Sequence, residues 1–256
     1  MPELPEVETV RQGLNQLTLN QTIQGGEVLL SRSLAYPASV AEFCQTITNN
    51  RIVSWQRRGK YLLAQLQDKN HNLAGWLGVH LRMTGQLLWL NSQQPVPKHT
   101  RIRLFFESQQ ELRFIDTRTF GKMWLVPANY KPAEIITGLQ KLGPEPFASE
   151  FSVTYLERKL SQSRARIKNM LLNQSLVAGI GNIYADEALF TSRIRPETIC
   201  ADLTKPQIKQ LHQAIQAVLK ASISRGGTTF SDFLNLLGIS GNYGDVAQVY
   251  GREGKA

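Results

Sequence analysis

The spacing of apolar residues changes twice along the chain, and this limits the fold more than any other feature of the sequence. Near the N-terminus they recur every three or four positions, which predicts an amphipathic helix. Its apolar positions are Leu4, Val7, Val10, Leu14 and Leu17. Short runs typical of strands follow, and helical spacing returns beyond Phe151. The sequence therefore predicts a region of strands followed by a region of helices.

Six short segments before residue 127 are predicted to be strands. In one of them Ile102, Leu104 and Phe106 occupy every second position, the pattern of a half-buried strand. The predicted segments are Val28–Leu30, Ile52–Val53, Tyr61–Leu66, Gly85–Leu90, Arg101–Phe106 and Leu112–Ile115. Several strands of this length predict a sandwich or a barrel.

Four prolines between Val126 and Phe151 predict a linker, with room for a short helical turn. The segments beyond it that are predicted to be helices are Tyr155–Gln162, Ala165–Asn173, Asn182–Phe190 and Pro206–Ser224. The remainder, from Arg225 to Ala256, is rich in glycine and polar residues and is predicted to be a mobile loop.

The composition narrows the class of protein. A chain of 256 residues forms one large domain or two small ones, and a formal net charge of +9 predicts binding to polyanions. No run approaches the ~18 apolar residues of a membrane span, and the acidic N-terminus is unlike a signal peptide. Cys44 and Cys200 are too few for a disulfide scaffold or a four-cysteine zinc site. These features favour a cytoplasmic protein.

The first six residues, Met1–Glu6, carry the strongest indication of chemistry. If Met1 is removed, the chain begins with Pro2, whose free amino group is a secondary amine beside the carboxylates of Glu3 and Glu6. A secondary amine that attacks a sugar carbon forms an iminium ion, as in Schiff-base catalysis by lysine. The plainer interpretation is that the prolines stiffen a helix start, where acids are also favoured.

Basic residues gather without acids in two segments. Arg51–Lys60 holds four of them, and Lys60 follows a glycine at the start of a strand, where it can contact a phosphate. Arg158–Ala185 includes Lys168 and a glycine turn that opens a helix, with Asn182 as its predicted cap. The free N–H groups of that helix start would form an anion site for a phosphate. Ordinary solvated or packed turns are the alternative.

Two turns carry residues suited to a distorted duplex. Met83 stands among polar residues close after His80, and Arg118 and Phe120 lie two positions apart, so that they project to the same side of an extended turn. An enzyme that extrudes a nucleotide must fill the space left behind, and an apolar wedge, a guanidinium and a ring suit that task. The plainer interpretations are a packed methionine, a structural histidine and a packed aromatic ring.

Taken as a set, these motifs resemble the formamidopyrimidine-DNA glycosylase family, bacterial enzymes that excise 8-oxoguanine and ring-opened purines. The resemblance runs from Pro2 to about Gly254, through PELPEVETVR, RRGKYL, HLRMTG, DTRTFG, LGPEP, GIGNIYADEALF, GGTT and QVYGREG. It implies an α+β fold of two domains. Residues 1–130 would form a catalytic β-sandwich with a leading helix, 131–150 a linker, and 151–256 a helical domain with a helix–two-turns–helix motif.

The resemblance also implies a role for each candidate. Pro2 would attack C1′ of the damaged nucleoside, Glu3 would donate and accept protons, and β- then δ-elimination would follow. The catalytic residues would be Pro2, Glu3, Glu6 and Lys60; those that bind DNA, His80, Arg118, Asn182 and Lys168; and those that fill the void, Met83, Arg118 and Phe120. A loop near Gly226–Asp245 would cover the damaged base. The partner would be duplex DNA with oxidised purines, bound by a monomer in the bacterial nucleoid.

Relatives usually continue past YGREGK into a zinc hairpin of four cysteines, whereas this sequence stops at Ala256 without one. No metal or other cofactor is therefore expected in this chain. Two other functions stay open: a non-catalytic nucleic-acid-binding protein, and an endonuclease VIII-like enzyme for oxidised pyrimidines. Pro2 argues against the first, since binding needs no secondary amine. Leu4 argues against the second, because the endonuclease VIII branch usually has glycine there.

Overall fold

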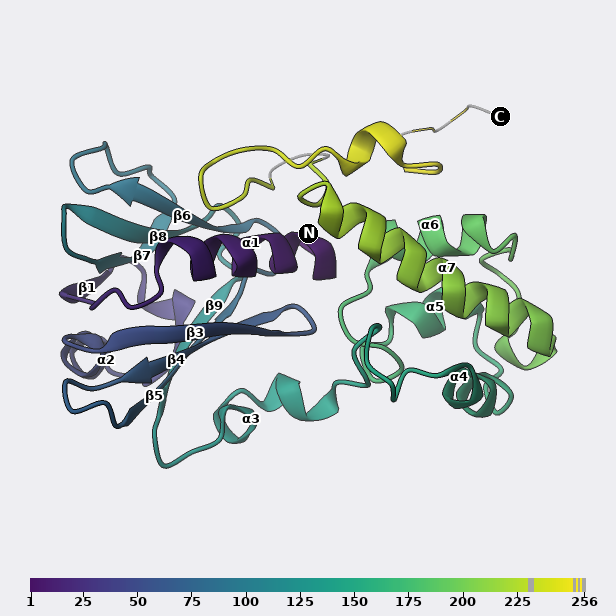
Figure 1. Ribbon diagram of the computed structural model, residues 1–256, viewed down its shortest axis with the longest axis horizontal. Helices are drawn as coiled ribbons and strands as arrows, with labels where there is room; N and C mark the ends of the chain where they lie inside the picture. Colours follow the sequence, from purple (N-terminus) through teal and green to yellow (C-terminus); the bar gives the residue numbers. More distant parts are fainter. Residues whose placement is uncertain (230–232, 251, 253, 255–256) are drawn as a thin grey trace.

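A β-rich N-terminal region and a helical C-terminal region lie side by side, joined by a linker along the lower edge of Figure 1. The computed structural model describes residues 1–229, 233–250, 252 and 254. The two regions confirm the expected two-domain α+β fold, while the division at 130 and 150 stays a prediction. Within the described part of the chain, every helix is too short or too polar to cross a membrane.

Nine strands lie in the N-terminal region and form two sheets that face each other. They are β1 (Gly25–Val28), β2 (Leu34–Tyr36), β3 (Arg51–Arg58), β4 (Tyr61–Gln67), β5 (Leu73–His80), β6 (Gly85–Asn91), β7 (Thr100–Phe105), β8 (Gln110–Asp116) and β9 (Lys122–Pro127). One sheet has the order β1-β7-β8-β6 and the other β2-β9-β5-β4-β3. Only β2 and β9 pair in parallel among these strands. Apolar side chains from both sheets share one core, which makes the region a sandwich.

Seven α-helices complete the described structure. They are α1 (Leu4–Leu17), α2 (Val40–Ile47), α3 (Pro132–Ile135), α4 (Val153–Leu160), α5 (Ile167–Leu172), α6 (Asn182–Thr191) and α7 (Lys205–Ser224). Short 3-10 helices lie at Ser31–Ser33, Thr137–Lys141, Cys200–Asp202 and Tyr243–Val246. The helices from α4 onward pack around a second core. The turns between α5 and α6 form the predicted helix–two-turns–helix motif.

Helix α1 lies on the sandwich and points its N-terminus at the helical region (Figure 1). Its apolar stripe is buried except for Leu17, which is partly buried, and burial is worth roughly 1.5–3 kcal/mol for each large aliphatic side chain. The Asn15 side chain exchanges two hydrogen bonds with the backbone of Trp55 in β3, of 2.9 and 3.0 Å. The Trp55 indole donates to the Thr18 hydroxyl at 2.9 Å. These contacts fix the direction in which the first residues leave the sandwich.

Three strands and one helix were absent from the sequence prediction: β2, β5, β9 and α2. Strand β5 lies between β4 and β9, and its second half is buried without alternation, so the period of two is lost. Strand β9 follows the Asp116–Gly121 turn directly and is a run of mostly apolar residues closed by Pro127. Helix α2 has eight residues, too few to establish a helical period.

The segment after α7 returns across the top of the molecule to the N-terminal region (Figure 1). Among its described residues, Phe233 and Leu236 belong to the core of the sandwich. Thr228 pairs with Asn242 in an isolated β-bridge. Residues 230–232, 251, 253, 255 and 256, part of the predicted mobile loop and of the base-covering segment, lie outside the described residues.

Candidate active site

The Glu3 carboxylate crosses the interface between the two regions and lies at the N-terminus of α6. Its oxygens accept from the backbone N–H groups of Gly181 at 2.6 Å, Ile183 at 3.0 Å and Tyr184 at 3.4 Å. A helix N-terminus favours an anion through its free N–H groups and its dipole. The N-terminal residues of the chain are therefore held by a helix that lies some 180 positions later in the sequence.

Two glycines allow this close approach. A Cβ added at Gly181 would lie 2.4 Å from the Glu3 carboxyl carbon, and one added at Gly179 would lie 2.7 Å from the Leu4 side chain. Gly179 also has a φ of +93°, and its carbonyl accepts from the backbone N–H of Leu4 at 3.0 Å. Any side chain at either position would push the start of α1 away from α6.

This geometry corrects the prediction that the start of α6 is a phosphate site. The N–H groups of Gly181, Ile183 and Tyr184 already bind Glu3, and the cap position is held by Gly181 rather than Asn182. The sequence motif was recognised as an anion site, but the anion comes from the chain itself. Asn182 is exposed at the first helical position, and its contact with DNA stays a prediction.

Glu6 is the second buried carboxylate and joins four parts of the fold. It accepts from the Glu3 backbone N–H at 2.8 Å, the Thr228 N–H at 2.8 Å and the Tyr184 hydroxyl at 2.5 Å. The same hydroxyl lies 2.6 Å from the Ser222 hydroxyl and 2.8 Å from that of Thr228. Helices α1 and α6 and the segment after α7 thus meet at one carboxylate, and α7 is joined to it through the Tyr184 hydroxyl.

Burial governs the protonation of this cluster. Desolvation raises the pKa of Glu3 to about 7 against the nearby charge of Lys60, and it also raises the pKa of Glu6 despite its hydrogen bonds. Desolvation lowers the pKa of Lys60, whose ammonium is in turn favoured by Glu3 and Glu6. A carboxyl group with a pKa near 7 is suited to give and take protons at neutral pH.

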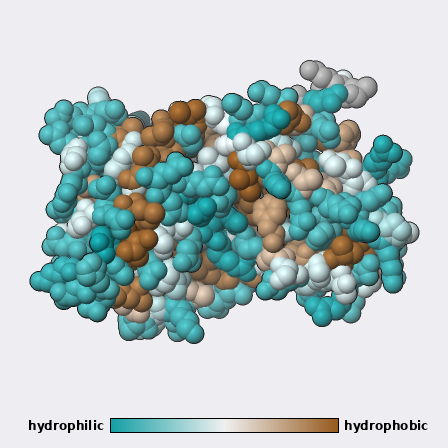
Figure 2. Space-filling view, viewed as in Figure 1, coloured by the Kyte–Doolittle hydropathy of each residue, from teal (hydrophilic) through white to brown (hydrophobic). Residues whose placement is uncertain are grey.

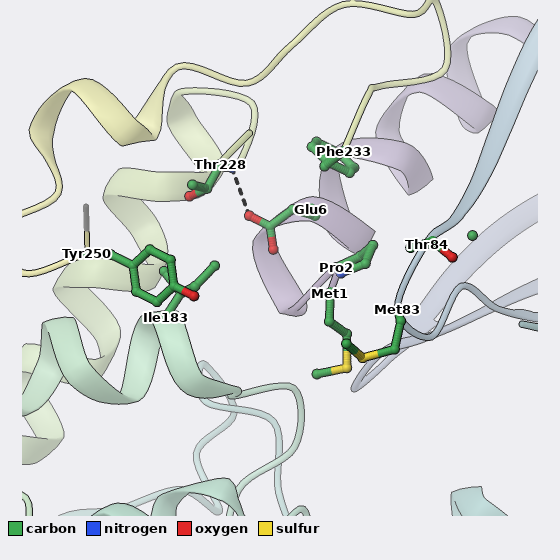
Figure 3. Close-up of a pocket in the computed structure, with 10 residues that line it drawn as sticks. Met1, Pro2, Glu6, Met83, Thr84, Ile183, Thr228, Phe233 and Tyr250 are labelled. Atoms are coloured by element: carbon green, nitrogen blue, oxygen red, sulfur yellow. Dashed lines mark hydrogen bonds between the residues drawn. The ribbon is translucent and has the colours of Figure 1, made fainter. Parts of the chain in front are cut away.

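Pro2 lies beside Glu6 on the wall of a cavity of about 80 Å³ (Figure 3). Pro2 is itself buried, whereas Met1 is exposed. The cavity is closed by residues from both regions and from the returning segment: Met83, Thr84, Gly85, Ile183, Thr228, Phe233 and Tyr250. The first residues of the chain therefore face a small, mainly apolar space with one carboxylate.

A larger cleft of about 640 Å³ opens beside this cavity, between the β4–β5 side of the sandwich and the turns before α6. Lys60, Arg82 and Lys141 line it together with Asn182, so the cleft is basic. His80 also lines it, but burial and the charges of Arg82 and Lys60 lower the pKa of His80 to about 3. The imidazole is therefore neutral, and its Nδ1 accepts from the Arg82 N–H at 3.0 Å.

The turns that carry Met83, Arg118 and Phe120 hold these side chains at the surface. Met83 is 38% exposed and Phe120 is 52% exposed. The Arg118 guanidinium lies 5.2 Å from the centre of the Phe120 ring, so the two side chains project together as predicted. Arg82 and Thr119 have φ values of +57° and +59°, unfavourable for residues with a β-carbon, and such strain is typical of functional sites.

Asp116 ties these two turns together. Its fully buried carboxylate accepts from the Thr84 hydroxyl at 2.5 Å and from the Gly121 N–H at 2.7 Å. The Thr84 hydroxyl oxygen in turn accepts from the Arg118 N–H at 3.1 Å. The three exposed side chains thus have one rigid base, although their predicted part in filling the void is a matter for experiment.

Lys168 lies in α5, away from the carboxylate cluster. Its ammonium pairs with Asp186 of α6 at 2.8 Å. Asp186 directly follows the acid-free segment Arg158–Ala185 in which Lys168 was predicted to bind DNA. A contact with a phosphate would have to compete with this ion pair. Three further residues of the site, Tyr184, Thr228 and Glu187, were not predicted from the sequence, although all three lie in motifs quoted above.

Glu187 is buried and holds the returning segment on α6. Its carboxylate accepts from three consecutive backbone N–H groups, those of Gln248 at 2.8 Å, Val249 at 2.9 Å and Tyr250 at 3.1 Å. Tyr250 is thereby placed on the wall of the cavity next to Pro2. The only sequence signal was a carboxylate on the apolar helix α6, where a buried charge requires partners.

Two family models match the chain. The formamidopyrimidine-DNA glycosylase N-terminal domain matches residues 1–123, and the formamidopyrimidine-DNA glycosylase H2TH domain matches residues 142–233. A formamidopyrimidine-DNA glycosylase of Nostoc punctiforme is 63% identical over 255 residues, which cover 100% of this chain and 87% of the relative. That of Trichodesmium erythraeum is 59% identical over 273 residues, covering 100% of this chain and 91% of the relative.

Solved structures agree with these matches. A mutant of Lactococcus lactis Fpg in complex with Fapy-dG-containing DNA superposes with a TM-score of 0.88 at 33% identity, covering 98% of this chain and 89% of the other. Lactococcus lactis Fpg in complex with DNA that contains an abasic site gives a TM-score of 0.87 at 33% identity, covering 98% and 88%. On these family models, relatives and structures, the chain belongs to the formamidopyrimidine-DNA glycosylase family.

Proposed function

We propose that this protein is a base-excision repair enzyme, a DNA glycosylase and abasic-site lyase that removes oxidised purines from duplex DNA. The observation that carries the proposal is the placement of Pro2 on the wall of a cavity beside Glu6, next to a Glu3 carboxyl group with a pKa of about 7. An amine nucleophile and a proton carrier with a matched pKa are what glycosidic cleavage through an iminium ion requires. The family named above supports this reading.

The reaction begins when Met1 has been removed and Pro2 carries the free secondary amine. Its nitrogen lone pair attacks C1′ of the damaged nucleoside, and the base leaves with the electrons of the glycosidic bond and takes up a proton. The Pro2 nitrogen, now bonded to C1′, gives up its own proton and regains a lone pair. Glu3 protonates O4′ as the sugar ring opens, which leaves an iminium bond between Pro2 and C1′. Held at the α6 N-terminus, Glu3 is fixed in place for this transfer.

Two eliminations follow from the iminium ion, which acts as the electron sink. Removal of a proton from C2′ breaks the C3′–O bond and releases the 3′ phosphate, and a second elimination breaks the C5′–O bond. Water then hydrolyses the remaining iminium and frees Pro2. The products are a one-nucleotide gap with phosphates on both sides and an unsaturated sugar fragment.

The basic cleft supplies a path for the DNA backbone. Lys60, Arg82 and Lys141 line it, and the net charge of +9 favours association with duplex DNA. Met83, Arg118 and Phe120 would enter the space left by the extruded nucleotide, and Asn182 and His80 would donate to its phosphates. With DNA as its substrate, the enzyme would work at the chromosome, in the bacterial cytoplasm. No resident cofactor takes part in this scheme.

The proposal is tested by blocking the amine. Protein with a free Pro2 is expected to cleave an 8-oxoguanine duplex, whereas protein with one additional residue before Pro2 is expected to lose strand cleavage and retain DNA binding. A thymine-glycol duplex in the same assay measures the preference for purines. Equal cleavage with free and blocked N-termini would refute the amine mechanism, and cleavage of thymine glycol alone would refute the purine assignment.

A further inference from the structure

Leu236 fastens the segment that returns from α7 to the sandwich. Leu236 is 1% exposed and belongs to the sandwich core together with Phe233. Its carbonyl accepts from the backbone N–H of Trp89 in β6 at 2.9 Å. Its side chain packs against α1, where a Cβ added at Gly13 would lie 3.2 Å from the Leu236 Cβ. This contact joins a segment of the C-terminal region to both β6 and α1.

The neighbouring apolar residues show that this burial is selective. Leu237 and Ile239 are 58% and 57% exposed. They belong to a compact turn in which the Asn235 side chain accepts from the N–H groups of Leu237 at 3.0 Å and Ile239 at 2.9 Å. Figure 2 shows hydrophobic surface at the upper left, where Figure 1 places this turn beside β6. The turn is therefore held by Leu236 alone among its three large aliphatic residues.

Leu236 lies close in sequence to Phe233, a residue of the cavity wall. Phe233, three residues earlier, lines the cavity beside Pro2 and Glu6 (Figure 3). Its carbonyl accepts from the Thr229 hydroxyl at 2.8 Å, and that hydroxyl oxygen accepts from the Gly241 N–H at 2.8 Å. Thr228 next to it donates its N–H to Glu6. The wall opposite Pro2 is thus held at Glu6 of α1 through Thr228 and at the sandwich through Leu236.

We infer that Leu236 is a positioning residue that sets the enzyme's preference for sites that still carry a base. The inference rests on the proposed function and assigns a role to a contact that touches no substrate itself. Phe233 faces the cavity that would receive the base of a damaged nucleotide. Leu236 fixes the position of Phe233 on that wall. An abasic site brings no base to that wall, so attack of Pro2 on its sugar does not depend on the contact.

The test compares Leu236→Ala with Leu237→Ala on two duplexes, one with 8-oxoguanine and one with a preformed abasic site. In Leu236→Ala, kcat/KM for base removal is expected to fall about 10- to 100-fold, the cost of a misplaced wall, while abasic cleavage stays within about twofold. In Leu237→Ala, both rates are expected to stay at the wild-type level. Abasic cleavage also shows that each variant is folded.

Two results would overturn the inference: an unchanged ratio of the two rates in Leu236→Ala, or an equal change of the ratio in Leu237→Ala. Failure of the proposed function looks different, because wild-type protein would then cleave neither duplex. Gly13→Ala provides a second variant that crowds Leu236 from α1 and leaves the returning segment unaltered. Alanine also favours the helix. A lowered ratio in this variant supports the role of the contact, and a wild-type ratio speaks against it.

Discussion

At the scale of single residues, the site depends on carboxylates that are buried before any substrate arrives. The sequence indicated that Pro2, Glu3 and Glu6 act together, because an amine and two acids stand within five positions. It could not indicate that Glu3 would occupy the N-terminus of α6, since nothing local links residues 178 positions apart. The helix start was recognised as an anion site, and only the source of the anion was misjudged.

The raised pKa of Glu3 has a consequence for stability. From an ordinary value of 4.5, burial raises the pKa to about 7, so the folded protein holds this proton more firmly than the unfolded chain. Protonated Glu3 therefore contributes to the free energy of unfolding in full below pH 4.5, and this contribution is lost as the pH rises through about 7. The loss amounts to up to about 3 kcal/mol. Glu3→Gln removes the titration, so its free energy of unfolding relative to wild type is expected to rise between pH 5 and pH 8.

Urea unfolding of both proteins at the two pH values measures this difference, and Glu8→Gln is the matched control. Burial would raise the pKa of Glu8, but the hydrogen bond and charge of Arg11 and the charge of Arg57 outweigh it and lower the pKa. The contribution of Glu8 to stability is therefore present above about pH 4.5, so its replacement should cost nearly the same free energy of unfolding at pH 5 and at pH 8. A rise in Glu8→Gln as large as that in Glu3→Gln would contradict the account.

At the scale of elements, α6 organises the site from its first two turns. Its N–H groups bind Glu3, its Tyr184 hydroxyl binds Glu6, and its Glu187 holds the segment that carries Tyr250. The predicted bounds of α6 and α7 differ from the observed ones by one residue, and in α7 the apolar face that predicted the helix repeats at 3.6 residues. Strand β5 escaped prediction because a central strand covered on both faces has no polar side to reveal its period.

Loss of the Tyr184 hydroxyl is expected to lower both the free energy of unfolding and the rate of base removal. Tyr184→Phe removes a donor from the buried Glu6 carboxylate and a partner from Ser222 and Thr228, which is expected to cost about 1–3 kcal/mol of the free energy of unfolding. Base removal should also slow, since Glu6 and the segment at Thr228 lose their common partner. Urea unfolding and single-turnover excision of 8-oxoguanine measure the two effects.

Tyr155→Phe is the control for this experiment. The Tyr155 hydroxyl donates to the backbone carbonyl of Leu176 at 2.9 Å, in the same helical region but without contact to a carboxylate. Its loss is expected to cost about 0.5–1.5 kcal/mol and to leave excision unchanged. If excision falls equally in both variants, the hydroxyl of Tyr184 has no special place in the site.

At the scale of the whole molecule, the two regions are joined at places far apart in sequence. Glu3 and Glu6 reach α6, and Leu236 returns to the sandwich. The linker contributes Glu145, whose carboxylate accepts from Arg57 at 2.6 Å, Arg58 at 2.9 Å and the Gly59 N–H at 2.7 Å. These bonds fix the β3–β4 turn immediately before Lys60. Composition and motifs predicted two regions and a linker, but contacts between distant segments leave no periodic trace in a sequence.

Glu145→Gln is expected to lower the free energy of unfolding by about 1.5–3 kcal/mol, because two arginines lose their partly buried partner. The β3–β4 turn should loosen, and binding of damaged DNA should weaken with it. Glu150→Gln is the control: Glu150 is exposed and bonds only to Ser149 among the described contacts, so a change within about 0.5 kcal/mol is expected. Urea unfolding and DNA titration of both variants test this, and equal effects would remove the special role of the linker glutamate.

The central claim is that Pro2 is the nucleophile, and trapping of the covalent intermediate tests it most directly. Protein with a free Pro2 is incubated with an 8-oxoguanine duplex and sodium borohydride, and the cross-linked peptide is located by mass spectrometry. The account predicts one DNA adduct, reduced to a stable amine, on the N-terminal nitrogen of Pro2. An adduct on Lys60 or another lysine, or strand cleavage without any adduct, would contradict it.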